Sequence, residues 1–167
     1  DMHIKYGKEN ESDVREAVRG VVINGDSIGI INVQKFDCYI FPGGGIDDGE
    51  NHEVALKREL LEEAGLLVEV GKYLLTTESF EPDFAHINHF YLCNIVGDGD
   101  TDYTEVEKEL NIQFEWITIT ELYDYYLEYE TDYRYGLVNA VIQNSIKSRG
   151  YLLLTLLDRM LNLDLMK

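Results

Sequence analysis

Apolar segments separated by turn residues run through the first two thirds of the chain. Most of them are rich in Val, Ile, Tyr and Phe, the residue types that favour β-strands. Asn24-Gly25-Asp26, between two such segments, is a strong signal for a tight hairpin turn. The pattern therefore predicts strands at residues 17–23, 28–33, 38–41, 66–73, 74–80, 86–96 and 112–119.

A helical period replaces this pattern between residues 51 and 64. Leu56, Leu60 and Ala64 recur every four residues and mark an apolar stripe that can pack on a core. Asn51 is a suitable N-cap, and Gly65 can adopt the left-handed conformation that ends a helix. One helix over 51–64 with defined ends is expected.

Further helices are expected after the last strand, one beginning at Glu121 with Thr120 as its cap, one over 137–146 and a Leu-rich one near the C-terminus. Strands in mixed order around one helix, followed by helices, predict an α/β (α+β) fold, an α/β/α sandwich around a mixed β-sheet. We interpret 1–167 as a single domain with a loose polar leading segment over 1–16. The terminal helix over 151–167 would pack on the sheet and could form a homodimer contact.

The chain carries a formal net charge of −18. Extended nucleic acid is an unsuitable partner, because binding a phosphate backbone requires stripes of Lys and Arg. A small nucleotide remains possible as a substrate, since its phosphates can arrive with metal ions that supply positive charge locally.

The composition is that of an ordinary globular protein, with 45% hydrophobic and 28% charged residues. We find no signal-peptide pattern ahead of the first strand and no apolar run of the ~18 residues that a membrane span needs. Cys38 and Cys93 both lie in apolar segments and are interpreted as buried thiols. A cytoplasmic protein with no membrane partner is expected.

Three carboxylates share one face of the expected helix. Glu59, Glu62 and Glu63 stand at i, i+3 and i+4. Like charges at this spacing destabilise an isolated helix by roughly 0.2–0.5 kcal/mol per pair. A hard divalent cation reverses the sign, because Mg²⁺ and Mn²⁺ prefer carboxylate oxygens. A solvated acidic surface is the general alternative for such a group.

The whole stretch from Gly44 to Leu66 is more specific than these three residues. It fits Gly-x5-Glu-x7-Arg-Glu-Leu-x-Glu-Glu-x-Gly-Leu at every specified position. This pattern is the signature box of the Nudix hydrolases, and the chain resembles that family. The resemblance implies the same α/β/α fold and metal-dependent cleavage of a nucleoside diphosphate linked to another group.

The resemblance also implies roles for individual residues. The metal shell, for Mg²⁺ or Mn²⁺, would comprise Glu59, Glu62, Glu63 and the carbonyl of Gly43. Glu62 or Glu59 would take the proton from the attacking water, and Arg58 would orient a glutamate through its planar fork. Glu50 would tie the glycine loop to the helix.

Other implied contacts depend on less specific positions. Family members often add a metal-binding carboxylate from the loop before the last strand; here Glu109 is preferred and Glu107 is the alternative. Arg residues that meet substrate phosphates in the family have no direct counterpart near Lys35, so Lys35 and Arg19 are the candidate substrate contacts. A run of tyrosines between 123 and 135 could stack a base or cover a core, and Asn139 could read a purine edge.

His86 and His89 invite a zinc interpretation, but a strand points residues three apart to opposite faces. With no third ligand nearby in the sequence, a structural role is preferred.

Four substrate classes are candidates: a nucleoside triphosphate, a nucleotide sugar such as ADP-ribose, a dinucleoside polyphosphate and an RNA 5′ end. The competing interpretation is a nucleotide-sensing module that kept the fold without turnover.

Overall fold

The computed structural model describes residues 3–6, 13–80, 84–118, 120–122 and 124–125. The elements in chain order are β1 (His3–Tyr6), β2 (Asp13–Asn24), β3 (Ser27–Val33), the 3-10 helix η1 (Gln34–Phe36), β4 (Cys38–Ile40), β5 (Gly43–Gly45), α1 (His52–Ala64), β6 (Leu66–Phe80), β7 (Phe84–Asp98), α2 (Glu105–Leu110) and β8 (Ile112–Thr118). None of the helices in these ranges is long and apolar enough to cross a membrane.

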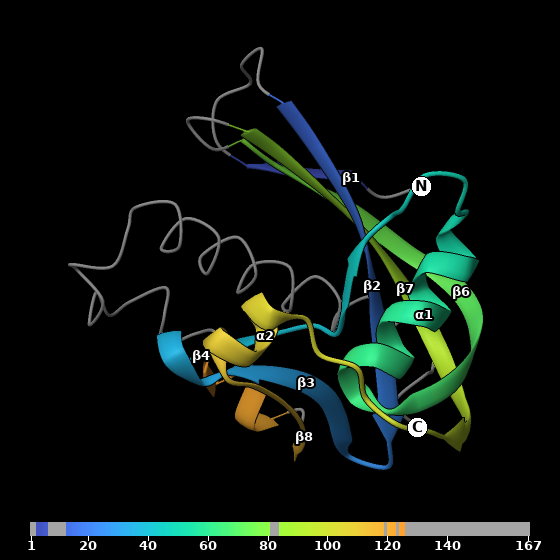
Figure 1. The fold of residues 1–167 in the computed structure, drawn as a ribbon, viewed down its shortest axis with the longest axis vertical. Helices are drawn as coiled ribbons and strands as arrows, with labels where there is room; N and C mark the ends of the chain where they lie inside the picture. Colours follow the sequence, from blue (N-terminus) through green and yellow to red (C-terminus); the bar gives the residue numbers. More distant parts are fainter. Residues whose placement is uncertain (1–2, 7–12, 81–83, 119, 123, 126–167) are drawn as a thin grey trace.

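One eight-stranded mixed sheet organises the fold, with strand order β1-β6-β7-β2-β3-β4. β5 pairs with β2, and β8 pairs with β3. β2 runs parallel to β7 over ten residue pairs and antiparallel to β5 over three. Figure 1 shows the long strands β2, β7 and β6 crossing the molecule beside α1. The expected α+β class with a mixed sheet is confirmed.

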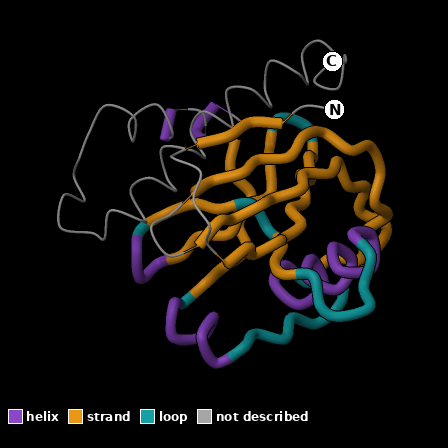
Figure 2. Tube along the Cα trace, turned by 90° about the horizontal axis from the view of Figure 1, so that it is seen from above, coloured by secondary structure: helices purple, strands orange, loops and turns teal. Residues whose placement is uncertain are grey.

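Apolar side chains pack on both faces of β2, which explains why apolar residues fill most of the stretch from Ala17 to Ile23. Val18 and Val22 point to the face where Leu56 and Leu60 of α1 pack. Val21 points to the opposite face, into a second core formed with β3, β6 and β7. Figure 2 shows α1 lying against one side of the layered strands. This packing fixes where the helix stands relative to the loop that precedes it.

The ends of α1 agree with the sequence prediction. The Asn51 side chain accepts a hydrogen bond from the Val54 N–H at 2.8 Å, and Gly65 has φ 65°. The Gly65 N–H closes the last turn on the carbonyls of Leu60 and Leu61. Local capping chemistry therefore sets the register of every carboxylate on the helix.

The expectation of a loose leading segment is wrong for residues 3–6 and 13–16, which form β1 and the start of β2. The side chains of residues 13–16 are exposed, so they leave no hydrophobic pattern. Backbone pairing holds this part of β2, from Asp13 opposite Phe84 to Glu16 opposite Ile87. Pairing with strands that are distant in the sequence therefore holds these residues in a regular strand conformation.

The segment before β8 was expected to be a loop and is instead the short helix α2. Thr104 accepts a hydrogen bond from the Glu107 N–H, and the Glu107 carboxylate accepts one from the Thr104 N–H. This reciprocal pair is a capping box, and its Thr-x-x-Glu pattern is visible in the sequence. At the end of β8, Thr118 and Glu121 make the same exchange, so Thr118 takes the place expected of Thr120.

Several predictions fall outside the described residues. They are the helices over 137–146 and 151–167 with the possible homodimer contact, the tyrosines of the run from 123 to 135 other than Tyr125, and Asn139.

Candidate active site

The glycine loop is fixed to the sheet directly before the helix. Gly43, Gly44 and Gly45 form β5 and pair with Arg19, Val18 and Ala17 of β2. Gly43 has φ 136°, and a Cβ there would lie 2.0 Å from the Val18 carbonyl oxygen. A Cβ on Gly44 would lie 2.6 Å from the Glu59 carboxylate. Glycine is required at position 43, where the backbone of β2 leaves no room for a side chain, whereas a side chain at position 44 would force the Glu59 carboxylate to move.

Two of the three predicted helix carboxylates are buried against this loop. Glu63 is 6% exposed, and its Oε2 accepts a hydrogen bond from the Gly43 N–H at 3.0 Å. Glu59 is 9% exposed beneath Gly44. Glu62 is more open to solvent, with 34% of its side chain exposed. The three carboxylates share a face, as the helical spacing predicts, but they differ in burial.

Burial changes the protonation of these groups. It raises the pKa of Glu63 from 4.5 to about 8, and the Gly43 N–H and the Arg19 charge offset part of the effect. Burial also raises the pKa of Glu59, against the hydrogen bond from Arg58. The neighbouring carboxylates raise both pKa values further. Glu62 raises the pKa of Glu59, and Glu59 and Glu107 raise the pKa of Glu63. The cluster therefore resists carrying its full negative charge unless a cation accompanies it.

Arg58 ties the loop to the carboxylates with one guanidinium group. It binds Glu50 through two hydrogen bonds of 2.7 and 2.8 Å, and Glu59 and Glu62 through Nη1 at 2.7 and 3.2 Å. Its Nη2 also reaches the Gly45 carbonyl at 3.0 Å. The hydrogen bonds from Arg58 lower the pKa of Glu50 to about 2, which keeps this half-buried carboxylate ionised. Arg58 therefore contacts both Glu62, one turn away on the helix, and the loop carboxylate of Glu50.

Arg19 reaches the same loop from β2. Its Nη1 donates to the Gly43 carbonyl at 2.9 Å and to the Phe41 carbonyl at 3.2 Å, and its Nε donates to Asn88 at 3.0 Å. The Gly43 carbonyl, the expected metal ligand, therefore accepts a hydrogen bond, and its second lone pair can still serve a cation. Sequence reasoning missed Asn88, because only the β2–β7 register brings it beside Arg19.

The structure favours Glu107 over Glu109 as the additional carboxylate. Glu107 is half-buried and raises the pKa of Glu63, whereas Glu109 is exposed. On a helix, residues two apart lie about 200° from each other around the axis, so the two carboxylates cannot face the same way. The preference for Glu109 assumed a loop here, and which of the two carboxylates binds metal stays a prediction.

Lys35 lies exposed on η1. Within the described residues no contact joins Lys35 to the carboxylates. Arg19 is therefore the cation of the predicted pair that the fold brings to the cluster.

Comparison with known proteins agrees with this geometry. The model of the NUDIX domain family matches residues 13–137. RNA pyrophosphohydrolases of Shewanella denitrificans and Shewanella piezotolerans are 39% and 38% identical over 72 residues. Each match covers 42% of this chain and 42% of the relative, so the chain spans less than half the length of these relatives.

Solved structures show the same fold at low identity. The MutT protein from Methanosarcina mazei Go1 is 15% identical with a TM-score of 0.55, covering 68% of this chain and 83% of that protein. The E. coli ORF135 protein is 20% identical with a TM-score of 0.54, covering 71% and 83%. A family match over most of the chain, with the glycine loop and carboxylate helix in place, means that this chain belongs to the NUDIX domain family.

Proposed function

We propose that this protein is a metal-dependent Nudix hydrolase that cleaves the pyrophosphate linkage of a nucleoside diphosphate joined to another group. The observation that supports it most is the cluster of Glu59, Glu62 and Glu63 beside the glycine loop, with two of the three carboxylates buried. A solvated acidic surface would leave all three exposed. Burying like charges together is unfavourable unless a ligand compensates for it.

The donor set fits Mg²⁺ or Mn²⁺. Carboxylate and carbonyl oxygens are the ligands these ions prefer, and Glu59, Glu62, Glu63 and the Gly43 carbonyl would hold the ion. The space that a Cβ on Gly44 would fill keeps the Glu59 carboxylate accessible from the loop. When bound, the metal neutralises phosphate charge and lowers the pKa of a coordinated water.

The side chains of this chain then have separate tasks. Glu62 has the most exposed carboxylate of the three and is held by Arg58, so it is placed to take the proton from the attacking water. Glu63 is fixed by the Gly43 N–H. Arg58 orients Glu59 and Glu62 together, and Arg19 fixes the loop carbonyls. Both arginines are positioning residues in this scheme.

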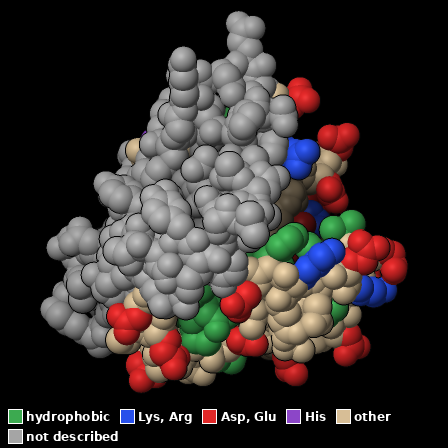
Figure 3. All heavy atoms as spheres, turned by 90° about the vertical axis from the view of Figure 1, so that its left-hand side faces the viewer, with side chains coloured by type: hydrophobic (Ala, Val, Ile, Leu, Met, Phe, Trp, Pro, Cys, Tyr) green, Lys and Arg blue, Asp and Glu red, His purple; other side chains and the backbone are tan. Residues whose placement is uncertain are grey.

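A small nucleotide is the favoured substrate class. Acidic side chains are spread over the described part of the face in Figure 3, with few basic ones among them. Such a surface disfavours a long phosphate backbone. Because two relatives are named RNA pyrophosphohydrolases, a triphosphorylated RNA end is also a substrate to be tested.

Turnover of a substrate panel tests the proposal. Nucleoside triphosphates, nucleotide sugars including ADP-ribose, dinucleoside polyphosphates and a triphosphorylated RNA would each be incubated with Mg²⁺, and the products identified. We expect metal-dependent cleavage between two phosphorus atoms in at least one class. Tight binding of a nucleotide without turnover of any class would instead support a nucleotide-sensing module.

Mg²⁺ should stabilise the protein more as the pH rises. The pKa of Glu63 is raised to about 8 in the folded protein, so its contribution to stability is fully present below about pH 4.5 and is lost as the pH rises through about 8. The raised pKa of Glu59 acts in the same direction. We therefore expect the Tm of the metal-free protein to fall between pH 5 and 8, and millimolar Mg²⁺ to restore it by mass action.

Thermal unfolding across this pH range with and without Mg²⁺ measures the effect. Glu63→Gln should flatten the pH dependence, whereas Glu53→Gln, on the exposed side of the same helix, should leave it unchanged. A Tm that Mg²⁺ does not change at any pH would count against a metal site here.

A further inference from the structure

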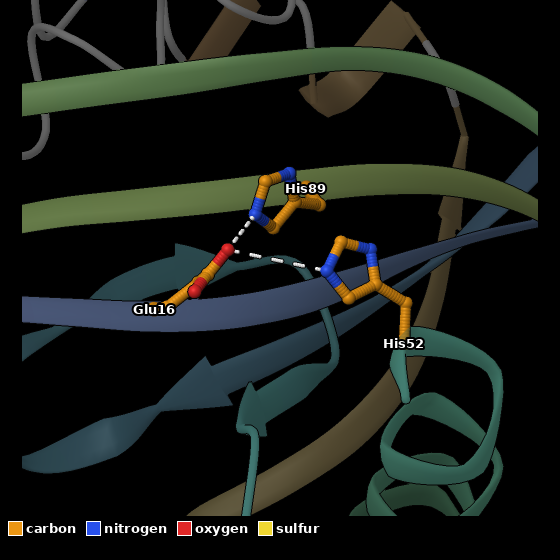
Figure 4. Close-up of side chains that lie close together, drawn as sticks. All are labelled: Glu16, His52 and His89. Carbon is orange, nitrogen blue, oxygen red and sulfur yellow. Dashed lines mark hydrogen bonds and ion pairs between the residues drawn. The ribbon is translucent and has the colours of Figure 1, made fainter. Parts of the chain in front are cut away.

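A second group of polar side chains lies at the start of α1, away from the glycine loop. Figure 4 shows Glu16 of β2, His52 of α1 and His89 of β7 pointing toward one another. The His89 Nε2 atom lies 2.5 Å from the Glu16 Oε1 atom, and the His52 Nε2 atom lies 3.9 Å from the same oxygen. One ligand atom from each residue lies within 4.8 Å of the other two.

The sheet register explains why residues so distant in sequence meet. β2 and β7 pair in parallel with Val18 opposite His89, so His89 shares a face with Val18 and with Glu16 two residues earlier. α1 packs on that face, and His52 is its first residue. Arg19 points to the other face. At 1.5 Å rise per residue, Glu59 and Glu63 lie about 10 and 16 Å further along the helix, so the two clusters are separate.

Both imidazoles are oriented by a hydroxyl on their other nitrogen. His52 Nδ1 lies 2.7 Å from the Tyr91 hydroxyl, and His89 Nδ1 lies 2.8 Å from the Thr76 hydroxyl. The Thr76 hydroxyl is in turn 2.8 Å from that of Tyr73. With Nδ1–H donating to these oxygens, both Nε2 lone pairs face the Glu16 carboxylate. Metal-binding histidines are held in this way by their outer hydrogen bonds.

The imidazole rings of His52 and His89 lie close to each other. Burial and the adjacent His89 ring lower the pKa of His52, against the attraction of Glu16. The two rings lie with centroids 4.3 Å apart, which disfavours a charge on both at once. A proton on His89 satisfies Glu16 but leaves the His52 Nε2 atom 3.9 Å from that oxygen, too far for a hydrogen bond. A cation between the three atoms would serve all of them.

We propose that Glu16, His52 and His89 form a binding site for a transition-metal ion of the zinc class. Two imidazole nitrogens and one carboxylate are a common protein ligand set for zinc, whereas Mg²⁺ prefers oxygen ligands alone. Bonds of 2.0–2.1 Å in a tetrahedron place ligand atoms about 3.4 Å apart, and the distances of 2.5 and 3.9 Å lie on either side of that value. The site requires only small side-chain shifts.

A fourth coordination position would face an open cavity. The cavity has a volume of about 410 Å³ and is lined by His3, His52, Tyr73, Thr76, His89 and Tyr91. Three protein ligands beside a cavity leave room for water or for an anionic ligand on the metal. The ion would also link β2, α1 and β7, so binding should stabilise the fold. This site is independent of the proposed hydrolase activity.

Metal binding to the full chain tests the site. Zn²⁺ at buffered micromolar concentrations would be followed by calorimetry and thermal unfolding, with Mg²⁺ in parallel. We expect one Zn²⁺ per chain and a higher Tm, with affinity reduced at least 10-fold in His52→Ala and in His89→Ala. Tyr91→Phe, which removes only the outer hydrogen bond of His52, should lower the affinity about 10–100-fold.

Two control variants exclude other sources of zinc binding. His86→Ala, on the same strand but three residues away, should bind Zn²⁺ like the wild type, because its side chain points to the opposite face. Glu62→Gln should also retain it, since that residue belongs to the other cluster. If Zn²⁺ binds His52→Ala and Tyr91→Phe as tightly as the wild type, or does not bind the wild type at all, the site is not a metal site and Glu16 only forms a hydrogen bond with His89.

Discussion

Glu62→Gln and Glu63→Gln should each lower kcat by at least about 10²-fold, the lower range for losing a general base, while the fold stays intact. Glu62 is the proposed proton acceptor, and Glu63 is a proposed metal ligand fixed by the Gly43 N–H. Glutamine keeps the size of the side chain but can neither accept the proton nor bring a negative charge to the metal. The loss should therefore appear in kcat while both variants remain folded.

Steady-state kinetics with Mg²⁺ on the substrate identified by the panel would measure the effect. Glu53→Gln is the matched control, because it makes the same change on the same helix at an exposed carboxylate that pairs with Lys57. Wild-type kcat in both Glu62→Gln and Glu63→Gln would refute the assignment of this cluster.

Gly44→Ala should lower kcat about 10–10²-fold without unfolding the protein. The added Cβ would lie 2.6 Å from the Glu59 carboxylate, which must then move. Glu59 is buried and bonded to Arg58, so a shift of this carboxylate also disturbs the position of Glu62. A displacement of about 1 Å in a catalytic arrangement can cost 10²-fold in rate.

Gly45→Ala is a control with an almost identical backbone context. A Cβ at Gly45 meets no atom within 4 Å, so activity and Tm should stay near wild type. Equal kinetics for Gly44→Ala and Gly45→Ala would mean that the position of Glu59 is not critical for turnover. A large loss of Tm in Gly44→Ala would show that the loop supports the fold more than the site.

The parts of this molecule that local chemistry determines were predictable from sequence. The Asn51 cap, the Gly65 end and the spacing of Glu59, Glu62 and Glu63 all lie within one helix, so the carboxylate face followed directly. The Asn24-Gly25-Asp26 turn joins β2 to β3 in the same way, with Gly25 at φ 63°. Local geometry, capping and the signature box all predict the same helix with the same carboxylate face.

Features that depend on long-range strand pairing were not predictable. The contact of Arg19 with Asn88 and the meeting of Glu16 with His89 both require the parallel register of β2 and β7. No periodicity within either strand specifies that register. The helix α2 is a different case, since its capping box of Thr104 and Glu107 is visible in the sequence, where a loop was expected.

Calorimetric titration of Mg²⁺ into the wild type and into a Glu59→Gln/Glu62→Gln double variant would show whether these carboxylates hold the metal. We expect saturable binding to the wild type at pH 8, where the Glu63 proton is readily displaced, and binding weakened beyond detection in the double variant, with both proteins folded. Equal heats and equal affinities for the two proteins would contradict the claim that these carboxylates hold the metal.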